Sequence, residues 1–517
     1  MGHQFQYNEN TVVETDKGKV KGYVYDGLAI FKGIPYAKAR RFHAPEPADA
    51  WEGVLDATSY GYVCPLLEMG KPDGELMVPH RYWVMDENCQ NLNIWTPGCD
   101  GAARPVMVWL HGGGFEAGSA IEQIAYEGEN MSRLGQVVVV SINHRLNVLG
   151  YFDLSDFGEE YANSGNAGTD DIVAALVWIQ KNIAAFGGNP GNVTVFGQSG
   201  GGAKVTTLLQ TPAADGLYVK GINMSGVIGP VLADSRGSGK ELACGIMDEL
   251  GIRDVKELET VPYDRLAAAY KKMRDILRPQ GKYVGGSPHP NAYYAGEPQE
   301  NGFRPETADI PLLVGSVFGE FGAFLPSKND RSKMSRQDGI DAVTQTVGEE
   351  AASEILPLFE KAYPDRNPVD LLLLDFMFRL PEQDYIAKRC ALNRCTWSYL
   401  FEQDFPIDGG HVAWHCSDIP YVFHNTELVP NTQMPGVEKL EEQIFECVMA
   451  FAHSGDPNHA GIPEWKPSSP GEEHTMLFSG DTREVVNHDH ELIPLVAKHM
   501  GPIFGKAMMS GDAEIQH

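Results

Sequence analysis

The sequence lacks the patterns that would place it in a membrane or around a structural zinc. No run of about 18 apolar residues occurs, so we expect no membrane-spanning helix. The eight cysteines include no C-x-x-C pair, which argues against zinc ribbons and thioredoxin-like redox motifs. The opening residues 1–6 have no apolar core of the secretory type, so we expect a cytoplasmic protein unless a leader preceded Met1.

Positive charge is scarce. The chain has 41 Lys and Arg against 70 Asp and Glu, a net charge of −29. Nucleic acids and anionic membrane surfaces bind basic footprints, so neither is expected as a partner. The acidic balance favours solubility and mildly favours neutral or cationic substrates over anionic ones. The 56 glycines and 33 prolines are typical of a loop-rich α/β enzyme rather than a helical bundle.

Continuous apolar runs predict a mostly parallel sheet. Residues 105–110, 137–142 and 193–196 are mostly apolar or β-branched and do not alternate with charged residues, as in strands buried on both faces. Between the second and third runs, residues 170–186 carry apolar side chains at helical spacing. The strand–helix–strand order predicts an α/β fold with helices covering the sheet, and residues 11–31 add short antiparallel strands.

The chain contains no repeat, low-complexity segment or linker. At 517 residues it exceeds the usual size of one domain, but large α/β folds run this long as single units. We therefore expect one catalytic domain over residues 1–517, with insertions at about 61–90, 235–310 and 325–395.

A G-x-S-x-G turn follows the strand at 193–196 and precedes a stretch of small residues that can open a helix. A serine on such a sharp strand-to-helix turn needs a strained backbone, and the glycines on either side avoid collisions. The strain presents the Ser199 hydroxyl at the end of the sheet. A glycine-rich turn can be purely structural, but the strand–turn–helix context favours a nucleophile.

An acyl-transfer serine needs donors for the oxyanion, and backbone N–H groups without side chains supply them best. The segment 111–115 reads His-Gly-Gly-Gly-Phe directly after a core strand, as in lipases and esterases. We predict Gly113, Gly114 and Gly200 as the donors. A phosphate-binding loop is the alternative, but the segment lacks the glycine and lysine spacing of such loops.

The base must come from sixteen histidines, and in this fold the order is serine, acid, histidine. His415 lies in a turn-rich loop after the strand ending at Phe401, and His411 is its rival in the same loop. Spacing alone does not decide between them. Their i, i+4 spacing could suggest a metal, but no Glu follows the first histidine and two glycines oppose a helix.

The acid should follow a core strand and precede the histidine. Glu320 comes just after the apolar stretch 310–315 and has apolar neighbours. A carboxylate in such surroundings is costly unless it serves a partner, which favours a functional role. Asp330 and Asp341 lie in polar stretches and are expected to be exposed.

With these residues in place, the sequence resembles the type-B carboxylesterases, which include bacterial esterases and cholinesterases. The likeness runs from about Gly18 to Met476. It is carried by residues 31–37, 87–95, 111–115, 143–146, 165–170, 186–190, 196–201, 315–320, 415–423 and 451–457. The resemblance implies the α/β-hydrolase fold, a catalytic set of Ser199, Glu320 and His415, and an oxyanion hole at Gly113, Gly114 and Gly200. It also favours His415 over His411.

Three residues depart from the pattern of this family. Gln198 stands where a Glu usually precedes the serine, Gly200 where an Ala usually follows it, and Phe321 where a Gly usually follows the acid. Without the carboxylate at 198, a choline ester is disfavoured as the main substrate. Cys64 and Cys89 match a pair that is bridged in secreted relatives, and we expect them to be reduced in the cytoplasm.

We therefore predict a serine carboxylic-ester hydrolase that forms an acyl-enzyme on neutral, small to medium esters, without cofactor or metal. Its partner is a small-molecule ester, and the sequence makes no prediction of oligomeric state. The candidate walls of the substrate pocket are Phe115, Trp83, Phe318, Gln198 and Phe423. An amidase or lactone hydrolase with the same catalytic set is the alternative, followed by a non-catalytic adhesion protein of the same fold.

Overall fold

The structure is a computed structural model that describes residues 5–6, 11–67, 78–227, 229, 237–324, 330–392, 395–407 and 409–510. Residues 1–4 of the opening segment lie outside this set, as do 68–77, 235–236, 325–329 and 393–394 of the expected insertions. The described chain forms two compact units. The first contains nearly all described residues up to Ile310, and the second contains those from Pro311 onward. The single domain expected from the sequence stays a prediction.

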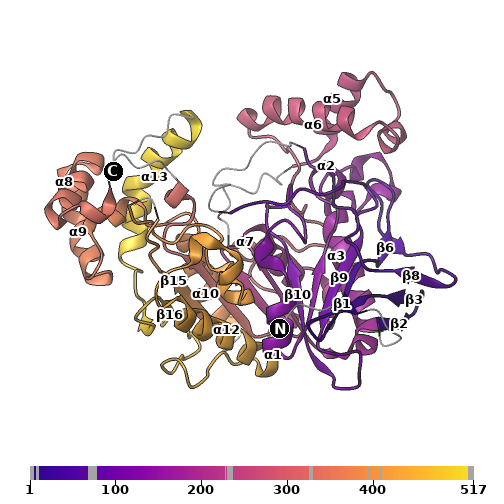
Figure 1. Ribbon diagram of the computed structural model, residues 1–517. Helices are drawn as coiled ribbons and strands as arrows, with labels where there is room; N and C mark the ends of the chain where they lie inside the picture. Colours follow the sequence, from indigo (N-terminus) through magenta and orange to yellow (C-terminus); the bar gives the residue numbers. More distant parts are fainter. Residues whose placement is uncertain are drawn as a thin grey trace. The chain divides into compact units, whose positions relative to one another are not determined.

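The first unit is built on a mixed sheet with strand order β1-β4-β5-β9-β11-β10-β12-β13. Figure 1 labels β1, β9 and β10 of this sheet. Its parallel strands are β11 (Val138–Ile142), β10 (Arg104–Leu110), β12 (Gly188–Gln198) and β13 (Lys220–Met224). Its antiparallel strands are β1 (Phe5–Gln6), β4 (Tyr23–Tyr25), β5 (Leu28–Pro35) and β9 (Asn91–Thr96). Every residue of β11 is buried, as its continuous apolar run predicts.

Two small sheets accompany the main sheet of the first unit. They contain β2 (Val12–Thr15), β3 (Gly18–Lys21) and β8 (Val54–Asp56), and β6 (Ala37–Lys38) with β7 (Glu46–Pro47). β2 and β3 are antiparallel, which confirms the antiparallel strands expected near the N-terminus. β12 begins five residues before the apolar run at 193–196, because Gly188 pairs with Arg104 ahead of an irregularity in the register.

The helices of the first unit follow the expected strand–helix order. They are α1 (Glu129–Gly135), α2 (Asn147–Gly150), α3 (Ala167–Asn182), α4 (Gly200–Leu209), α5 (Lys240–Leu250), α6 (Tyr263–Leu277) and α7 (Pro298–Asn301). α3 buries Ile172, Leu176 and Ile179, the apolar positions that predicted it. α4 packs on β10, β12 and β13, so the strand-to-helix turn before it is held by the sheet.

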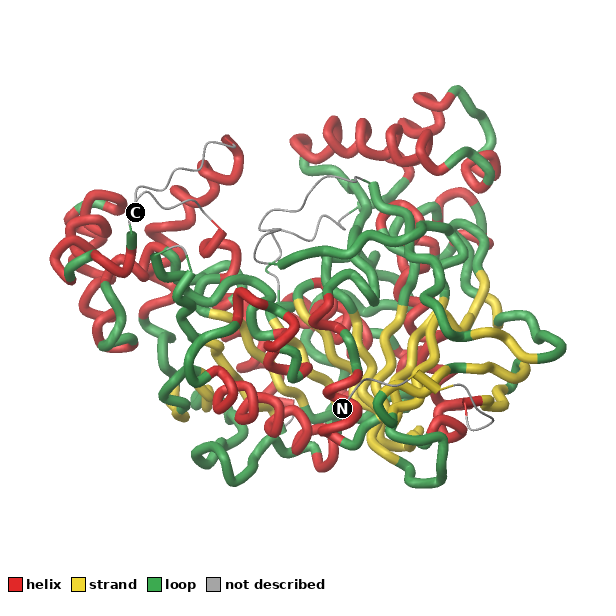
Figure 2. Tube along the Cα trace, in the orientation of Figure 1, coloured by secondary structure: helices red, strands yellow, loops and turns green. Residues whose placement is uncertain are grey.

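The second unit contains the hydrogen-bonded strands β14, β15, β16 and β17, in that order. Strands are drawn in yellow in Figure 2. β14 (Leu312–Val317), β15 (Thr396–Phe401) and β16 (His474–Phe478) are parallel, and β17 (Arg483–Val486) is antiparallel to β16. Its helices are α8 (Arg336–Val347), α9 (Glu349–Ala362), α10 (Arg379–Leu392), α11 (Ile419–Phe423), α12 (Val437–Ser454) and α13 (Leu492–Ser510). Sequence reasoning did not predict β16, β17 or α13.

Cys64 and Cys89 are free, buried thiols in the core of the first unit. The Cys64 sulfur accepts a hydrogen bond of 3.3 Å from the backbone N–H of Leu146. Among the helices that the structure describes, none is both long and apolar enough to cross a lipid bilayer.

Candidate active site

Ser199 lies in the first unit, on the turn between β12 and α4. Its backbone has φ 58° and ψ −127°, a conformation that a residue with a side chain adopts only under strain. Two hydrogen bonds hold it there: the Ser199 N–H donates to the oxygen of Met224 (2.8 Å), and the Ser199 carbonyl accepts from the N–H of Ala203 (3.0 Å). The turn therefore has the strained geometry that a nucleophile elbow requires.

Gly200 directly follows the serine and has no space for a side chain. A Cβ atom there would lie 2.1 Å from the oxygen of Gly114 and 2.4 Å from its Cα. The start of α4 and the glycine loop after β10 are thus in direct backbone contact. The structure brings Gly114 and Gly200, two of the three predicted oxyanion donors, to the same place as the predicted nucleophile.

The glycine loop adopts a conformation that favours glycine. Gly113 and Gly114 have φ angles of 84° and 62°, in the left-handed region. The carbonyl of Gly113 accepts a hydrogen bond from the N–H of Ala117 (2.9 Å), which closes a tight turn. Gly113 is exposed and Gly114 is partly exposed, so this part of the loop can meet a ligand.

Glu320 and His415 form a pair in the second unit. Glu320 begins a 3₁₀ helix, Glu320–Phe324, directly after β14, and it is fully buried. One carboxylate oxygen accepts from the N–H of Val317 (2.9 Å), and the other is hydrogen-bonded to Nδ1 of His415. The His415 N–H also donates to the backbone oxygen of Glu320 (3.2 Å). An imidazole that donates from Nδ1 to a carboxylate has Nε2 as its proton acceptor.

Aromatic rings pack against the His415 imidazole, which is 5% exposed. The Phe321 ring lies 4.3 Å from it between centroids, and the Phe378 ring lies at 5.4 Å. Phe321, which departs from the usual glycine, therefore contacts the predicted base directly. His411, the rival histidine, instead pairs through its backbone with Phe405 in a short β-bridge.

Two further buried acids surround the Glu320–His415 pair. Burial raises the pKa of Asp375 and of Asp418 to about 7, and the charge of Glu320 adds to the shift. Asp418 accepts a hydrogen bond from the Tyr399 hydroxyl (2.8 Å). Asp375 accepts from the backbone N–H groups at the start of α10, including that of Arg379 (3.0 Å). The electrostatic surroundings of Glu320 therefore include two further carboxyl groups whose protonation is favoured near neutral pH.

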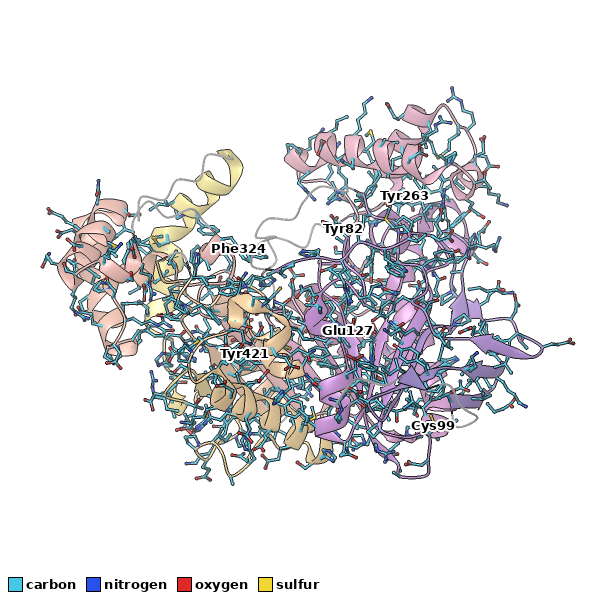
Figure 3. All side chains as sticks on the ribbon, in the orientation of Figure 1. Tyr82, Cys99, Glu127, Tyr263, Phe324 and Tyr421 are labelled. Carbon is cyan, nitrogen blue, oxygen red and sulfur yellow. The ribbon has the colours of Figure 1, made fainter. Side chains whose placement is uncertain are left out.

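The predicted pocket walls lie in different surroundings. In the first unit, Gln198 is buried and Phe115 is half-buried, whereas Trp83 is 44% exposed and packs edge-on against Tyr60. The neighbouring Tyr82 is exposed as well (Figure 3). In the second unit, Phe318 and Phe423 are fully buried. The two acidic residues expected to be exposed differ, since Asp341 is exposed and Asp330 is only partly so. The wall assignments stay predictions.

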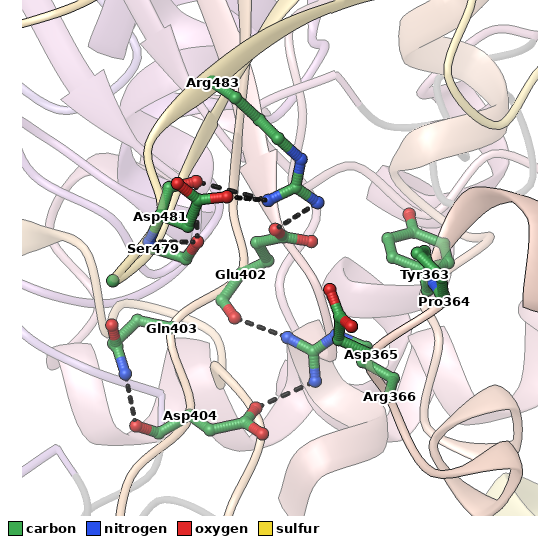
Figure 4. A pocket seen from close by; sticks show the side chains of 11 residues that line it. Tyr363, Pro364, Asp365, Arg366, Glu402, Gln403, Asp404, Ser479, Asp481 and Arg483 are labelled. Atoms are coloured by element: carbon green, nitrogen blue, oxygen red, sulfur yellow. Dashed lines mark hydrogen bonds and ion pairs between the residues drawn. The ribbon is translucent and has the colours of Figure 1, made fainter.

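A polar pocket of about 270 Å³ lies in the second unit (Figure 4). Arg366 pairs with Asp404 (2.8 Å) and donates to the backbone oxygen of Glu402, and Arg483 pairs with the Glu402 carboxylate (3.4 Å). The Arg366 guanidinium also lies 3.9 Å from the centre of the Phe318 ring. These ion pairs fix the walls of the pocket and make it polar. A neutral ester needs a mostly apolar site, so this pocket does not suit it.

Sequence reasoning missed several residues that contact the predicted site. In the first unit, Lys204 donates hydrogen bonds to the glycine loop. In the second, Phe378, Asp375 and Asp418 surround the acid–base pair. Lys204 had a signal, because it is the only charged residue between positions 193 and 209. Phe378 and Asp375 lie far in sequence from the motifs that were recognised. Asp418 lies three residues after His415, but no motif indicated a role for it.

The structure assembles the predicted residues in two groups. Within the first unit it brings together Ser199, Gly200 and the glycine loop, and within the second it joins Glu320 to His415. Joint action of the two groups is a prediction from the sequence. Across the described residues, no group of three or more His, Cys, Asp or Glu side chains is arranged to hold a metal ion.

Comparison with known proteins gives one consistent result. A model of the carboxylesterase family matches residues 9–492. The chain is 31% identical over 494 residues to para-nitrobenzyl esterase of Bacillus subtilis (strain 168), covering 93% of this chain and 95% of that protein. It is 30% identical to phenmedipham hydrolase of Pseudarthrobacter oxydans over 505 residues, covering 93% of this chain and 98% of that protein.

Solved structures agree. An esterase of the anaerobe Clostridium hathewayi, described as able to hydrolyse aliphatic aromatic polyesters, is 49% identical with a TM-score of 0.94, covering 96% of this chain and 100% of that one. A carboxylesterase of Geobacillus stearothermophilus is 32% identical with a TM-score of 0.72, covering 94% and 99%. These neighbours have the α/β-hydrolase fold, so the predicted fold is confirmed.

Proposed function

The chain belongs to the carboxylesterase family and is a serine carboxylic-ester hydrolase, and from this we propose its catalytic residues. Ser199 is the nucleophile, His415 is the general base, and Glu320 is the acid that orients the base. The observation that carries the assignment is the hydrogen bond between the Glu320 carboxylate and Nδ1 of His415. It gives the imidazole the tautomer in which Nε2 can accept a proton. The strained turn at Ser199 supports the nucleophile.

In the proposed mechanism, the Ser199 hydroxyl oxygen attacks the ester carbonyl carbon while Nε2 of His415 takes the hydroxyl proton. The carbonyl oxygen becomes an oxyanion that accepts hydrogen bonds from backbone N–H groups of Gly113, Gly114 and Gly200. Collapse breaks the bond to the alcohol oxygen, which takes the proton from the imidazolium. Water then cleaves the acyl-enzyme through the same steps, so the chemistry needs no cofactor.

The proposed substrates are neutral esters of small to medium size. The net charge of −29 disfavours anionic substrates, and Gln198 provides no carboxylate for a quaternary ammonium group. A panel of p-nitrophenyl esters of graded chain length locates the preferred acyl group. Because a relative hydrolyses aliphatic aromatic polyesters, the panel includes a soluble aromatic diester as a model of those polymers.

Two substitutions test the catalytic set. We expect S199A to abolish ester turnover and labelling by a fluorophosphonate probe, because the substitution removes the oxygen that attacks the ester and the probe. We expect E320Q to lower kcat by about 10⁴-fold, since an amide cannot enforce the same tautomer. Unchanged turnover in folded S199A would overturn the proposal.

The likeness to esterases does not favour the alternative functions, namely an amidase, a lactone hydrolase or an adhesion protein. Matched ester, amide and lactone substrates of one acyl group compare the first two directly. The cytoplasmic location and the lack of a nucleic-acid partner stay predictions from the sequence.

A further inference from the structure

Lys204 is a buried lysine beside the predicted oxyanion hole. It lies on α4, five residues after Ser199, and is only 1% exposed. Its Nζ donates one hydrogen bond to the carbonyl of His111 (2.9 Å) and another to the carbonyl of Gly114 (2.8 Å). These two carbonyls flank the glycine loop at its start and at its end.

The inner carbonyls of the loop are engaged as well. The Gly112 oxygen accepts from Nδ1 of His111 (2.9 Å), which carries the hydrogen because a carbonyl can only accept. The Gly113 oxygen accepts from the N–H of Ala117 (2.9 Å). All four carbonyls from 111 to 114 are therefore held by named donors. Because each carbonyl shares a rigid peptide plane with the next N–H group, fixing the carbonyls also fixes the directions of the glycine N–H groups.

Glycines need such external restraint. Without side chains, Gly113 and Gly114 lose more conformational freedom on ordering than other residues do, and they have no packing of their own to fix them. Gly200 lies one helical turn before Lys204, on the same face of α4. It lets the Gly114 carbonyl approach within a distance that any side chain at 200 would block. Lys204 and Gly200 thus act on the same carbonyl.

Burying the amine of Lys204 costs free energy, so the presence of a lysine at this buried position needs a physical reason. Burial lowers the pKa of Lys204 to about 7, and Glu122 partly opposes the shift. The neighbouring His111 and His144 are neutral, because burial and the charge of Lys204 lower their pKa values well below the usual range. A buried charge is a poor source of net stability. A role in positioning the loop accounts for it better.

We propose that Lys204 is a positioning residue for ester hydrolysis: it holds the carbonyls of His111 and Gly114 so that the glycine N–H groups between them stay directed at the oxyanion. The inference rests on the proposed role of this loop as the oxyanion hole. It adds a side chain that acts on the transition state through the backbone, without touching the substrate.

The test replaces Lys204 by Met, which keeps the length and apolar stem and removes the donor. We expect K204M to lower kcat roughly 10- to 100-fold with KM within about twofold, because misdirected oxyanion donors affect the transition state and not the ground state. We expect a trifluoromethyl ketone, which forms an oxyanion with the serine, to lose affinity by a similar factor. K204Q, which keeps a donor, should retain more activity than K204M.

Lys220 provides the matched control. It is another buried lysine of the first unit, 6% exposed, and burial lowers its pKa to about 8. Its Nζ donates a hydrogen bond to the side-chain oxygen of Asn192. K220M should leave kcat and ketone affinity unchanged, and circular dichroism and melting temperature are compared for all variants. Wild-type kcat in K204M, equal losses in K220M, or failure of both Lys204 variants to fold would overturn the proposal.

The two proposals fail in different ways. Full turnover in S199A would remove the nucleophile assignment and with it the oxyanion role of the loop. Loss of turnover in S199A together with wild-type kcat in K204M would leave the catalytic set in place and remove the role of Lys204 alone.

Discussion

Gly200 and Gly114 meet at a contact that leaves no room for a methyl group. A Cβ at 200 would lie 2.1 Å from the Gly114 oxygen, and Lys204 donates a hydrogen bond to that same oxygen. The backbone cannot yield without moving an oxyanion donor. The absence of a side chain at 200 is thus part of the geometry of the site.

We predict that G200A lowers kcat at least tenfold, since displacement of one oxyanion donor typically costs about 10²- to 10³-fold when it is complete. Steady-state kinetics on a neutral p-nitrophenyl ester measures the loss. G101A is the control, because a Cβ at Gly101 meets open space. In the G200A/K204M double variant the loop is released, so the two losses should be less than additive. Full additivity would show that the two residues act independently.

At the scale of elements, one buried ion pair connects the end of β11 to α3. Arg145, just after β11, donates to Asp171 on α3 through Nε (2.9 Å) and Nη2 (2.7 Å). Both side chains are almost fully buried. The same guanidinium donates to the backbone oxygens of Arg40 and His43, so it also holds the N-terminal segment.

We predict that R145M lowers the free energy of unfolding by about 3–5 kcal/mol, because it leaves the Asp171 carboxylate buried and unpaired. Urea unfolding followed by tryptophan fluorescence measures the free energy of unfolding of R145M and of wild type. The control is R104M, which breaks the pair of Arg104 with the half-exposed Asp100 and should cost far less. Equal costs for the two variants would contradict the argument from burial.

A second buried cluster links α10 to the strands of the second unit. Arg379 donates to Glu382 (2.8 Å), to Glu473 (2.8 Å) and to Asp489 (2.9 Å). Burial raises the pKa of Glu382 to about 8, while the charge of Arg379 opposes the shift. Glu382 therefore holds a proton in the folded chain that the unfolded chain releases near pH 4.5.

This proton makes a defined contribution to pH dependence. A folded pKa raised above the unfolded one gives stability that is complete below pH 4.5 and is lost as the pH rises to about 8. E382Q mimics the protonated form, so its stability relative to wild type should increase over this range, by at most about 1.4 kcal/mol per pH unit. Urea unfolding from pH 5 to 8 measures it. E464Q, which changes an exposed glutamate, is the control. If the difference in free energy of unfolding between E382Q and wild type did not change with pH, the assignment of a raised pKa to Glu382 would be contradicted.

The elements that the sequence predicted are those with a periodic or continuous apolar signal. The runs at 105–110, 137–142 and 193–196 each became a buried strand, and the helical spacing of 170–186 became α3. β16 was missed because its five residues mix polar and apolar types without alternation. Local pattern cannot identify a strand whose burial depends on its neighbours.

The same limit applies to the site. Ser199 and the glycine loop could be predicted because turn chemistry is local, and Glu320 because a carboxylate among apolar residues is costly. His415 and His411 lie four residues apart in one loop, and only the resemblance separated them. Lys204 was missed because its two acceptors lie about 90 residues earlier in the chain. Its burial depends on packing that the sequence does not reveal.

At the scale of the whole molecule, acidic residues outnumber basic ones by 70 to 41. The net charge is −29 and the isoelectric point is about 4.9. Such a field repels anions and attracts cations before they reach the site, and salt screens it over about 8 Å at physiological ionic strength.

We predict that kcat/KM for an anionic p-nitrophenyl ester rises severalfold, roughly three- to tenfold, between 10 and 300 mM salt, because screening removes the repulsion. A neutral ester of similar size should show no change, and a cationic one should show a decrease. Rates measured on the three esters across the salt series provide the comparison. A parallel response of all three would indicate a general salt effect on the enzyme and contradict steering by charge.

The base is connected to its acid twice, once between side chains and once between backbones, through the His415 N–H and the Glu320 oxygen. Point mutations can remove the first connection, but a main-chain amide survives every replacement except proline. A replacement that removes the carboxylate therefore leaves this backbone hydrogen bond in place, so the loop keeps one of its two attachments to position 320.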